Sequence, residues 1–173
     1  MREVYGYLAN QFGFSETGLY LLDHLIKPRI EKIGIIINDP FIECGKELDP
    51  ENLLQLKSHN AVKKYWERFS KKVTPINNRL MQNSHCMLAL LDGGHAIDDG
   101  VASEIGYYTA LGKGPIFALR SDFRGGENIA TLINPQVLGY ISQSKGQLID
   151  GTNAIERWFE AVKLWYDSFK ENP

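Results

Sequence analysis

Four carboxylates lie close together near the middle of the chain and are candidates for acid, base or nucleophilic chemistry. Asp92 follows an apolar run, Asp98 and Asp99 open a helical pattern, and Glu104 lies one turn inside that pattern. The aspartates have structural alternatives. Asp92 can end a strand in a turn, and either Asp98 or Asp99 can cap the helix by accepting a hydrogen bond from a free backbone N–H.

Glu104 is the least ordinary of these acids. Helical spacing places it on the same stripe as three apolar side chains, namely Val101, Ile105 and Tyr108. Burying a lone charge is far more costly than any helix propensity could offset. Either this face is not buried at Glu104, or the carboxylate lies in a cleft where it does chemistry. Gly106 and Gly112 favour the cleft, because a glycine within a helix costs roughly 1 kcal/mol against alanine and indicates a close approach.

Other catalytic and binding motifs do not occur in the sequence. The chain contains neither G-x-G-x-x-G nor G-x-x-x-x-G-K-[ST] after an apolar run, and no G-x-S-x-G. Its histidines show no metal-ligand spacing with one another or with the cysteines. His95 lies in a glycine-containing loop, where it is either catalytic or simply solvated. We therefore expect no metal and no organic cofactor.

Length and composition indicate one globular domain over residues 1–173. Hydrophobic residues make up 43% and charged residues 23%, and the net charge of −2 gives no general attraction to nucleic acid or anionic lipid. The N-terminus has no long apolar segment, and no run is long enough to cross a bilayer. Cys44 and Cys86 are too few for a disulfide framework. These features predict a soluble protein in the reducing cytoplasm.

The elements that must position the acids alternate between short apolar runs and helical patterns. The expected strands are 3–9, 33–38, 86–92, 115–120 and 137–142, and the expected helices are 15–34, one or two within 49–73, 75–84, one within 98–115 and 153–169. This alternation predicts an α/β fold with three layers. The expected sheet is open and mainly parallel, with about five strands in a flavodoxin-like or Rossmann-like order. Helices are expected on both of its faces. In such sheets, ligands bind beyond the carboxyl ends of the strands.

Three local patterns make more specific predictions. Pro28 should bend or break the helix over 15–34. The continuous apolar run over 33–38 favours a strand buried on both faces. The segment 61–73 repeats apolar residues at helical spacing, so its lysines are expected on the solvent face of a helix packed in the core.

Three stretches together resemble the nucleoside 2-deoxyribosyltransferase family. The first is "YLANQFGFSE", similar to the family's opening strand and loop. The second, "LLDGGHAIDDGVASEIGYYTALGKGP", follows the family pattern Asp-Gly, a variable loop, Asp-x-Gly-x-x-x-Glu-Ile-Gly-Tyr and Gly-Lys. The third is "RSDFRGGENIATLINPQ". The resemblance covers most of the chain and the order of its elements.

The resemblance implies a role for several residues. Glu104 corresponds to the nucleophile that attacks the anomeric carbon of a 2′-deoxyribonucleoside, and Tyr7 to the tyrosine that orients it. Asp98 corresponds to the sugar-binding aspartate, and Gly100 belongs to the same substrate-binding pattern. Further implied substrate contacts are made by Asp92, whose role is less defined, and by Asn134, which reaches into a neighbouring subunit's site. The family's activity implies a cytoplasmic homo-oligomer, between a dimer and a hexamer, that serves nucleotide salvage.

The sequence departs from the family pattern at two positions. Asn77 stands where some members have an aspartate that holds and protonates the base, although an amide can still hydrogen-bond a base edge. Gln136 stands where the family often has methionine. Aromatic residues near the expected site, Phe12, Phe14 and Trp66, can either stack on a base or pack in the core.

The reaction implied by the resemblance is a double displacement. The glutamate forms a covalent glycosyl-enzyme, and a second base then takes the sugar with retention of configuration. Two alternatives remain open. Water can replace the second base, which gives an N-glycosidase acting on 2′-deoxynucleosides or their 5′-monophosphates, for which Arg120 and Arg124 are candidate phosphate ligands. The chain can also be a nucleotide-binding domain without turnover.

Overall fold

The fold is built on a single sheet of five parallel strands. The computed structural model describes residues 3–94, 96–122 and 133–171. The strands are β1 (Val4–Ala9), β2 (Ile35–Asn38), β3 (Cys86–Leu90), β4 (Ile116–Arg120) and β5 (Gln147–Asp150), in the order β2-β1-β3-β4-β5. This is the flavodoxin-like order of a doubly wound sheet. The predicted α/β fold class is confirmed.

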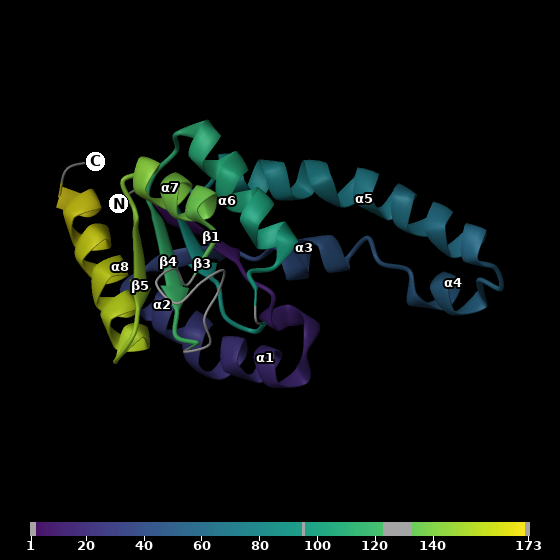
Figure 1. Cartoon of the computed structure of the whole chain (residues 1–173), viewed down its shortest axis with the longest axis horizontal. Helices are drawn as coiled ribbons and strands as arrows, with labels where there is room; N and C mark the ends of the chain where they lie inside the picture. The colour runs from purple at the N-terminus through teal and green to yellow at the C-terminus, as the bar shows by residue number, and fades with distance from the viewer. Residues whose placement is uncertain (1–2, 95, 123–132, 172–173) are drawn as a thin grey trace.

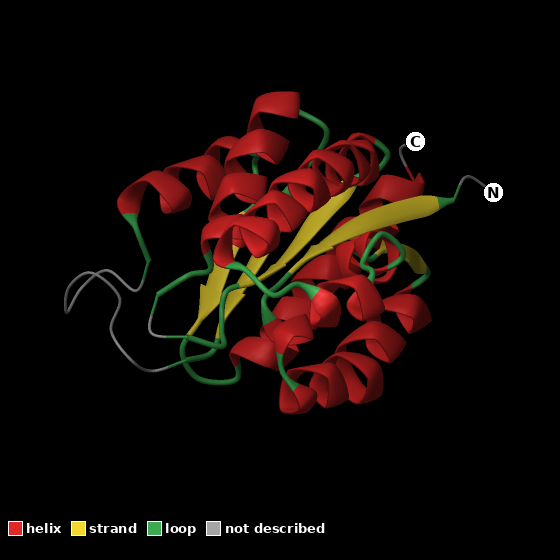
Figure 2. Cartoon of the chain, turned by 90° about the vertical axis from the view of Figure 1, so that its right-hand side faces the viewer, coloured by secondary structure: helices red, strands yellow, loops and turns green. Residues whose placement is uncertain are grey.

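Helices cover both faces of the sheet (Figures 1 and 2). The helices are α1 (Glu16–Leu21), α2 (Lys27–Ile33), α3 (Pro40–Gly45), α4 (Pro50–Gln55), α5 (His59–Gln82), α6 (Asp99–Leu111), α7 (Pro135–Gln143) and α8 (Ala154–Glu171), with a 3₁₀ turn, η1 (Phe12–Phe14), after β1. One core lies between the sheet and α2 and α8, and the second between the sheet, α6 and α7. Side chains of β1 alternate between them, since Leu8 enters the first and Tyr7 the second.

The first helical segment begins and ends where its sequence predicts. The Ser15 side chain accepts a hydrogen bond from the Gly18 backbone N–H at 3.0 Å, and Gly34 ends α2 in the left-handed region with φ of 108°. A π-helical turn, η2 (Leu22–Ile26), joins α1 to α2. Pro28 lies just after this turn, at the start of α2, where the missing N–H is tolerated. The chain therefore accommodates Pro28 without a break.

Two strand predictions need correction. Residues 137–142 form part of α7, because Asn134 caps this segment, Pro135 occupies its first position, and Val137 and Ile141 are buried at helical spacing. The last strand is instead β5. The strand over 33–38 is not buried on both faces, because β2 is an edge strand and Ile36 is 41% exposed.

Helix α5 is longer and less buried than expected. It continues through Pro75 to Gln82, so residues 75–82 are its last two turns and not a separate helix. Pro75 lies on the exposed side, where water can bind the carbonyl that lacks its usual partner. Together with α4, the first half of α5 extends beyond the sheet (Figure 1). Its Tyr65 is buried but Trp66 is 44% exposed, so the segment 61–73 is not a core helix.

Among the described residues, no helix has the length and apolar character needed to cross a membrane.

Candidate active site

A cleft of about 510 Å³ opens beyond the carboxyl ends of β1 and β3. These two strands flank the point where the strand order reverses, which is where open α/β sheets bind their ligands. The cleft is lined by Asn10, Gly13, Phe14, Pro40, Phe41, Cys44, Gly45, Leu48, Trp66, Phe69, Val73, Asn77, Asp98, Gly100, Val101 and Glu104. One side therefore carries carboxylates and the other aromatic and apolar groups.

Glu104 lines this cleft, and the buried Tyr7, which is not among the lining residues, holds it in place. The fully buried ring of Tyr7 points from β1 towards α6, where its hydroxyl donates a 2.6 Å hydrogen bond to Glu104 Oε1. The other members of the Glu104 stripe, Val101, Ile105 and Tyr108, are buried against the sheet. Glu104 thus lies on a buried face, at a place where that face borders a cleft.

The pKa of Glu104 is raised from its ordinary value near 4.5 to about 7. Burial is the largest cause, and the Asp98 carboxylate adds to the rise, whereas the hydrogen bond from Tyr7 lowers the pKa. The pKa of Tyr7 is itself raised, mainly by burial and then by the Glu104 charge, so Tyr7 remains a neutral donor. Glu104 consequently titrates close to neutral pH, and its ionised form is the nucleophilic one.

This raised pKa predicts a dependence of stability on pH. Between pH 4.5 and 7 the folded chain binds a proton at Glu104 that the unfolded chain has released, so the free energy of unfolding falls as pH rises through that window. Since one pKa unit corresponds to about 1.4 kcal/mol, Glu104→Gln should stabilise the protein above pH 7 by up to about 3 kcal/mol and change little below pH 4.5. Urea unfolding near pH 8 and near pH 4 measures both values. Equal effects at the two pH values would contradict the assigned pKa.

Asp98 has two roles at the start of α6. Its Oδ1 accepts the backbone N–H of Val101 at 3.1 Å, so Asp98 is the N-cap of the helix. It also lines the cleft beside Glu104, and its Oδ2 makes no hydrogen bond with the described part of the chain. Gly100 leaves room for the cap, because a Cβ there would lie 2.9 Å from Asp98 Oδ1. One oxygen of Asp98 thus holds the helix and the other is available to a ligand.

Asn77 lies in the cleft on α5, opposite α3. Its Oδ1 accepts a hydrogen bond at 3.0 Å from the thiol of Cys44. The pKa of Cys44 is raised to about 11, first by burial and then by the carboxylate of Glu104, so the sulfur carries its proton at neutral pH. Cys44 is not among the predicted site residues, because nothing in its local sequence indicates a contact with a residue 33 positions away.

The structure does not bring Asp92 to the cleft. Its carboxylate accepts the backbone N–H groups of Ser121 and Asp122 at 2.9 Å and the Ser121 hydroxyl at 2.5 Å. Asp92 therefore ties the end of β3 to the end of β4. Arg120 is also buried and donates to the Leu91 carbonyl at 2.6 Å, which makes it a structural residue and not a surface ligand for phosphate.

Three other predicted substrate residues also lie away from this cleft. Phe12 packs against the first core, whereas Phe14, which is 76% exposed, lines the cleft. Asn134 and Gln136 are exposed at the start of α7, where Asn134 Oδ1 accepts the Gln136 backbone N–H at 2.9 Å. The role of Asn134 at a neighbouring subunit's site and the substrate contact of Gln136 remain predictions. His95 and Arg124 lie outside the described residues.

The two glycines of the α6 pattern have separate explanations. A Cβ on Gly106 would lie 3.3 Å from the Tyr140 ring, so the close approach is that of α7 and not of a ligand. Gly112 has φ of 61° and ends α6 in the left-handed region. Neither glycine supports the site directly.

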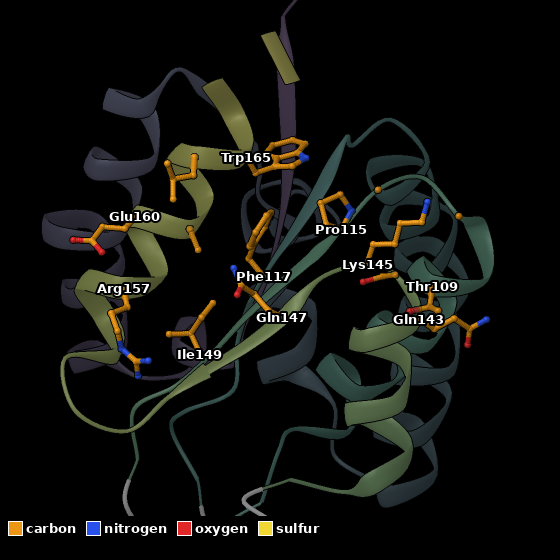
Figure 3. A pocket seen from close by; sticks show the side chains of 15 residues that line it. Thr109, Pro115, Phe117, Gln143, Lys145, Gln147, Ile149, Arg157, Glu160 and Trp165 are labelled. Atoms are coloured by element: carbon orange, nitrogen blue, oxygen red, sulfur yellow. The ribbon is translucent and has the colours of Figure 1, made fainter. Parts of the chain in front are cut away.

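A larger hollow, of about 1030 Å³, lies along the open side of β5 and α8 (Figure 3). Phe117, Ile149 and Trp165 form its apolar part, and Arg157 and Glu160 project from α8. Glu160, the one carboxylate among the described residues of this lining, is exposed to solvent. Because no sheltered acid faces it, we place the chemistry in the smaller cleft.

Comparison with known proteins agrees with this fold. A family model described as nucleoside 2-deoxyribosyltransferase matches residues 6–151. Among solved structures, the CMP N-glycosidase BcmB of Clostridium botulinum is 15% identical, with a TM-score of 0.54 over 90% of this chain and 96% of that one. A 2-deoxyribosyltransferase from Leishmania mexicana is 15% identical, with a TM-score of 0.54 over 91% and 97% of the two chains. A third, the 2-deoxyribosyltransferase of Bacillus psychrosaccharolyticus, is 17% identical, with a TM-score of 0.53 over 90% of each chain.

None of the curated protein sequences matches this chain. The strand order and the helices on both faces define an α/β protein that shares the fold of these solved structures. Within that class, the chain belongs to the nucleoside 2-deoxyribosyltransferase family, because the family model spans most of its length. The predicted family is confirmed.

Proposed function

We propose that this protein transfers 2-deoxyribose between nucleobases through a covalent intermediate on Glu104. The observation that carries this proposal is the partly buried hydrogen bond between Tyr7 and Glu104, whose carboxylate lines the cleft. This hydrogen bond orients the carboxylate and occupies one of its oxygens. The second oxygen, Oε2, is then the one directed at substrate.

In the first step, Glu104 Oε2 forms a bond to C1′ as the bond from C1′ to the base nitrogen breaks, and the electron pair leaves with the base. The departing base takes up a proton or a hydrogen bond. The transition state resembles an oxocarbenium ion, which the carboxylates of Glu104 and Asp98 stabilise. A second base then displaces Glu104, so two inversions give overall retention.

The cleft provides separate regions for the sugar and the base. Asp98 and Gly100 lie beside Glu104, so the free oxygen of Asp98 can accept a sugar hydroxyl. Across the cleft are four aromatic side chains able to stack on a planar base, contributed by η1, α3 and α5: Phe14, Phe41, Trp66 and Phe69. Asn77 lies on the same side and supplies the polar contact to the edge of the base.

Hydrolysis with the same nucleophile is the second candidate function. The similarity of this fold to that of a CMP N-glycosidase is the observation that favours it. The charges of the cleft favour an uncharged nucleoside over a 5′-monophosphate. Two carboxylates and no lysine or arginine occur among the described lining residues, and Arg120 is buried elsewhere. A binding domain without turnover is not favoured, because a partly buried carboxylate with a raised pKa that lines a cleft is typical of catalytic sites.

One experiment separates these functions. The protein is mixed with a 2′-deoxynucleoside and a different free base, and products are separated by liquid chromatography. We expect a new deoxynucleoside. Free sugar without exchange would indicate the hydrolase, and ligand binding by calorimetry without either product would indicate the binding domain. Repeating the assay with the 5′-monophosphate tests the charge argument, and we expect it to react more slowly.

Asn77→Asp tests how the base is handled. The new carboxylate would lie in a cleft that already holds Asp98 and Glu104, so it should titrate at a raised pKa and donate a proton to the base only while protonated. We expect base preference or the pH profile of exchange to change by about 10-fold at some pH values, without loss of activity. Exchange rates for four bases between pH 5 and pH 9 measure this. An unchanged profile and base range would exclude Asn77 from base handling.

We also expect a cytoplasmic homo-oligomer that serves nucleotide salvage, in which Asn134 reaches a neighbouring site and Gln136 contacts substrate. Both are exposed, as these roles require. Light scattering on the eluted protein measures the number of subunits.

A further inference from the structure

The hydrogen bond between Cys44 and Asn77 gives the cleft a second ordered element. Cys44 lies in the last turn of α3 and Asn77 in the second half of α5, and the two helices pack against each other. The thiol donates to Asn77 Oδ1 at 3.0 Å. Both side chains line the same cleft as Glu104. This contact therefore lies within reach of a ligand that Glu104 attacks.

The chemistry of the two groups gives the contact a direction. A carboxamide presents an acceptor at one end and two N–H donors at the other, and rotation by half a turn exchanges them. A protonated thiol has one hydrogen to donate, and burial beside the Glu104 carboxylate keeps the thiol protonated. The thiol donates this hydrogen bond to Oδ1 and therefore fixes which end of the amide faces Cys44. The Nδ2 group then lies at the opposite end. Nδ2 makes no hydrogen bond with the described part of the chain.

We propose that Cys44 is a positioning residue that holds the Asn77 amide with its N–H donors towards the base, so that the site selects bases presenting a carbonyl oxygen or an unprotonated ring nitrogen there. This inference rests on the proposed function, because it assumes that a base occupies the aromatic side of the cleft. A donor placed at this point also suits catalysis. The base gains negative charge as its bond to C1′ breaks, so a hydrogen bond from Nδ2 strengthens as the reaction proceeds.

A double-mutant cycle tests the coupling directly. The dissociation constants of adenine, hypoxanthine, cytosine and thymine are measured by calorimetry for the full chain, Cys44→Ala, Asn77→Ala and the double variant. For the base that binds the wild type most tightly, we expect Cys44→Ala to weaken binding by about 3- to 10-fold, the usual range for one hydrogen bond. In the Asn77→Ala background the same change should have no further effect. Additive effects of the two substitutions would overturn the proposal, and so would a wild type that binds none of the four bases.

Conservative and control variants separate positioning from simple packing. Cys44→Ser retains a donor, so we expect a dissociation constant within about 2-fold of wild type. Binding by Cys44→Ser as weak as that by Cys44→Ala would indicate packing alone. Ile42→Ala changes an exposed side chain of α3 that does not line the cleft, and it should leave binding unchanged. Thermal unfolding of each variant establishes that it is folded.

The same preparations are assayed for base exchange, which distinguishes the two proposals. A wild type that exchanges bases while the cycle is additive would remove the role of Cys44 and leave the proposed function intact. A coupled cycle in a protein that neither exchanges nor hydrolyses would remove the proposed function and leave the base site intact.

Discussion

Glu104→Ala is expected to lower the rate of base exchange by at least about 10³-fold. Without the carboxylate, no group in the described cleft can form the covalent bond to C1′, because Asp98 is partly committed to capping α6. The fold should persist, since the substitution removes a buried charge and leaves Val101, Ile105 and Tyr108 packed against the sheet. Steady-state exchange and circular dichroism measure the two effects.

The matched control is Glu160→Ala, which removes an exposed glutamate on α8 that does not line the cleft. This variant should exchange bases at the wild-type rate. An active Glu104→Ala enzyme would remove the proposed nucleophile. If Glu104→Ala is inactive because it is unfolded, Glu104→Gln is assayed instead. Its amide oxygen can still accept the Tyr7 hydrogen bond, and it too should be inactive.

Tyr7→Phe is expected to produce the second-largest loss, of roughly 10- to 100-fold near pH 6, the range for one hydrogen bond to a charged group. The Tyr7 hydroxyl lowers the pKa of Glu104, so its removal should raise that pKa above about 7. The ionised form of Glu104 is the nucleophile, so activity should increase with pH as Glu104 loses its proton. In the variant this increase should occur at a higher pH. The loss should therefore shrink towards pH 9.

A pH profile of kcat/KM for wild type and Tyr7→Phe measures this effect. We expect the ascending limb of the profile near pH 7 in the wild type and at a higher pH in the variant. Two profiles that differ only by a constant factor would mean that Tyr7 orients Glu104 without affecting its proton. Identical activities would mean that the 2.6 Å hydrogen bond has no role in the reaction.

The features of α6 show how much of the site local sequence can predict. Helical spacing places Glu104 among Val101, Ile105 and Tyr108, and the structure buries all three apolar side chains. The cost of burying a lone charge then requires either exposure or a cleft, and the structure provides the cleft. The cap at Asp98 also follows from local chemistry. The partner of Glu104 does not, because Tyr7 lies 97 residues away.

The errors in the predicted fold arise where several arrangements satisfy the same local pattern. Residues 137–142 are apolar enough for a strand, and the cap at Asn134 with Pro135 decides for helix. The run over 33–38 would suit a central strand, but the sheet order places β2 at an edge. Strand order is set by packing between distant segments, which the composition of one strand does not report.

The site residues that could not be predicted depend on contacts between distant elements. Phe12 and Phe14 are the same residue type two positions apart, so the sequence does not distinguish them. The 3₁₀ turn η1 directs Phe12 to the core and Phe14 to the cleft. Asp92 is an acid at a strand end, as expected of a ligand, yet the backbone after β4 engages its carboxylate. Cys44 becomes relevant only because α3 packs on α5.

Mass spectrometry of the protein after incubation with a slowly reacting 2-fluoro analogue of a 2′-deoxynucleoside tests the central claim most directly. We expect a mass increase of one fluorodeoxyribosyl group, located by proteolysis on the peptide that contains Glu104, and no increase for Glu104→Ala. A sugar adduct on a different residue would contradict the account, and so would turnover of the analogue with no adduct formed.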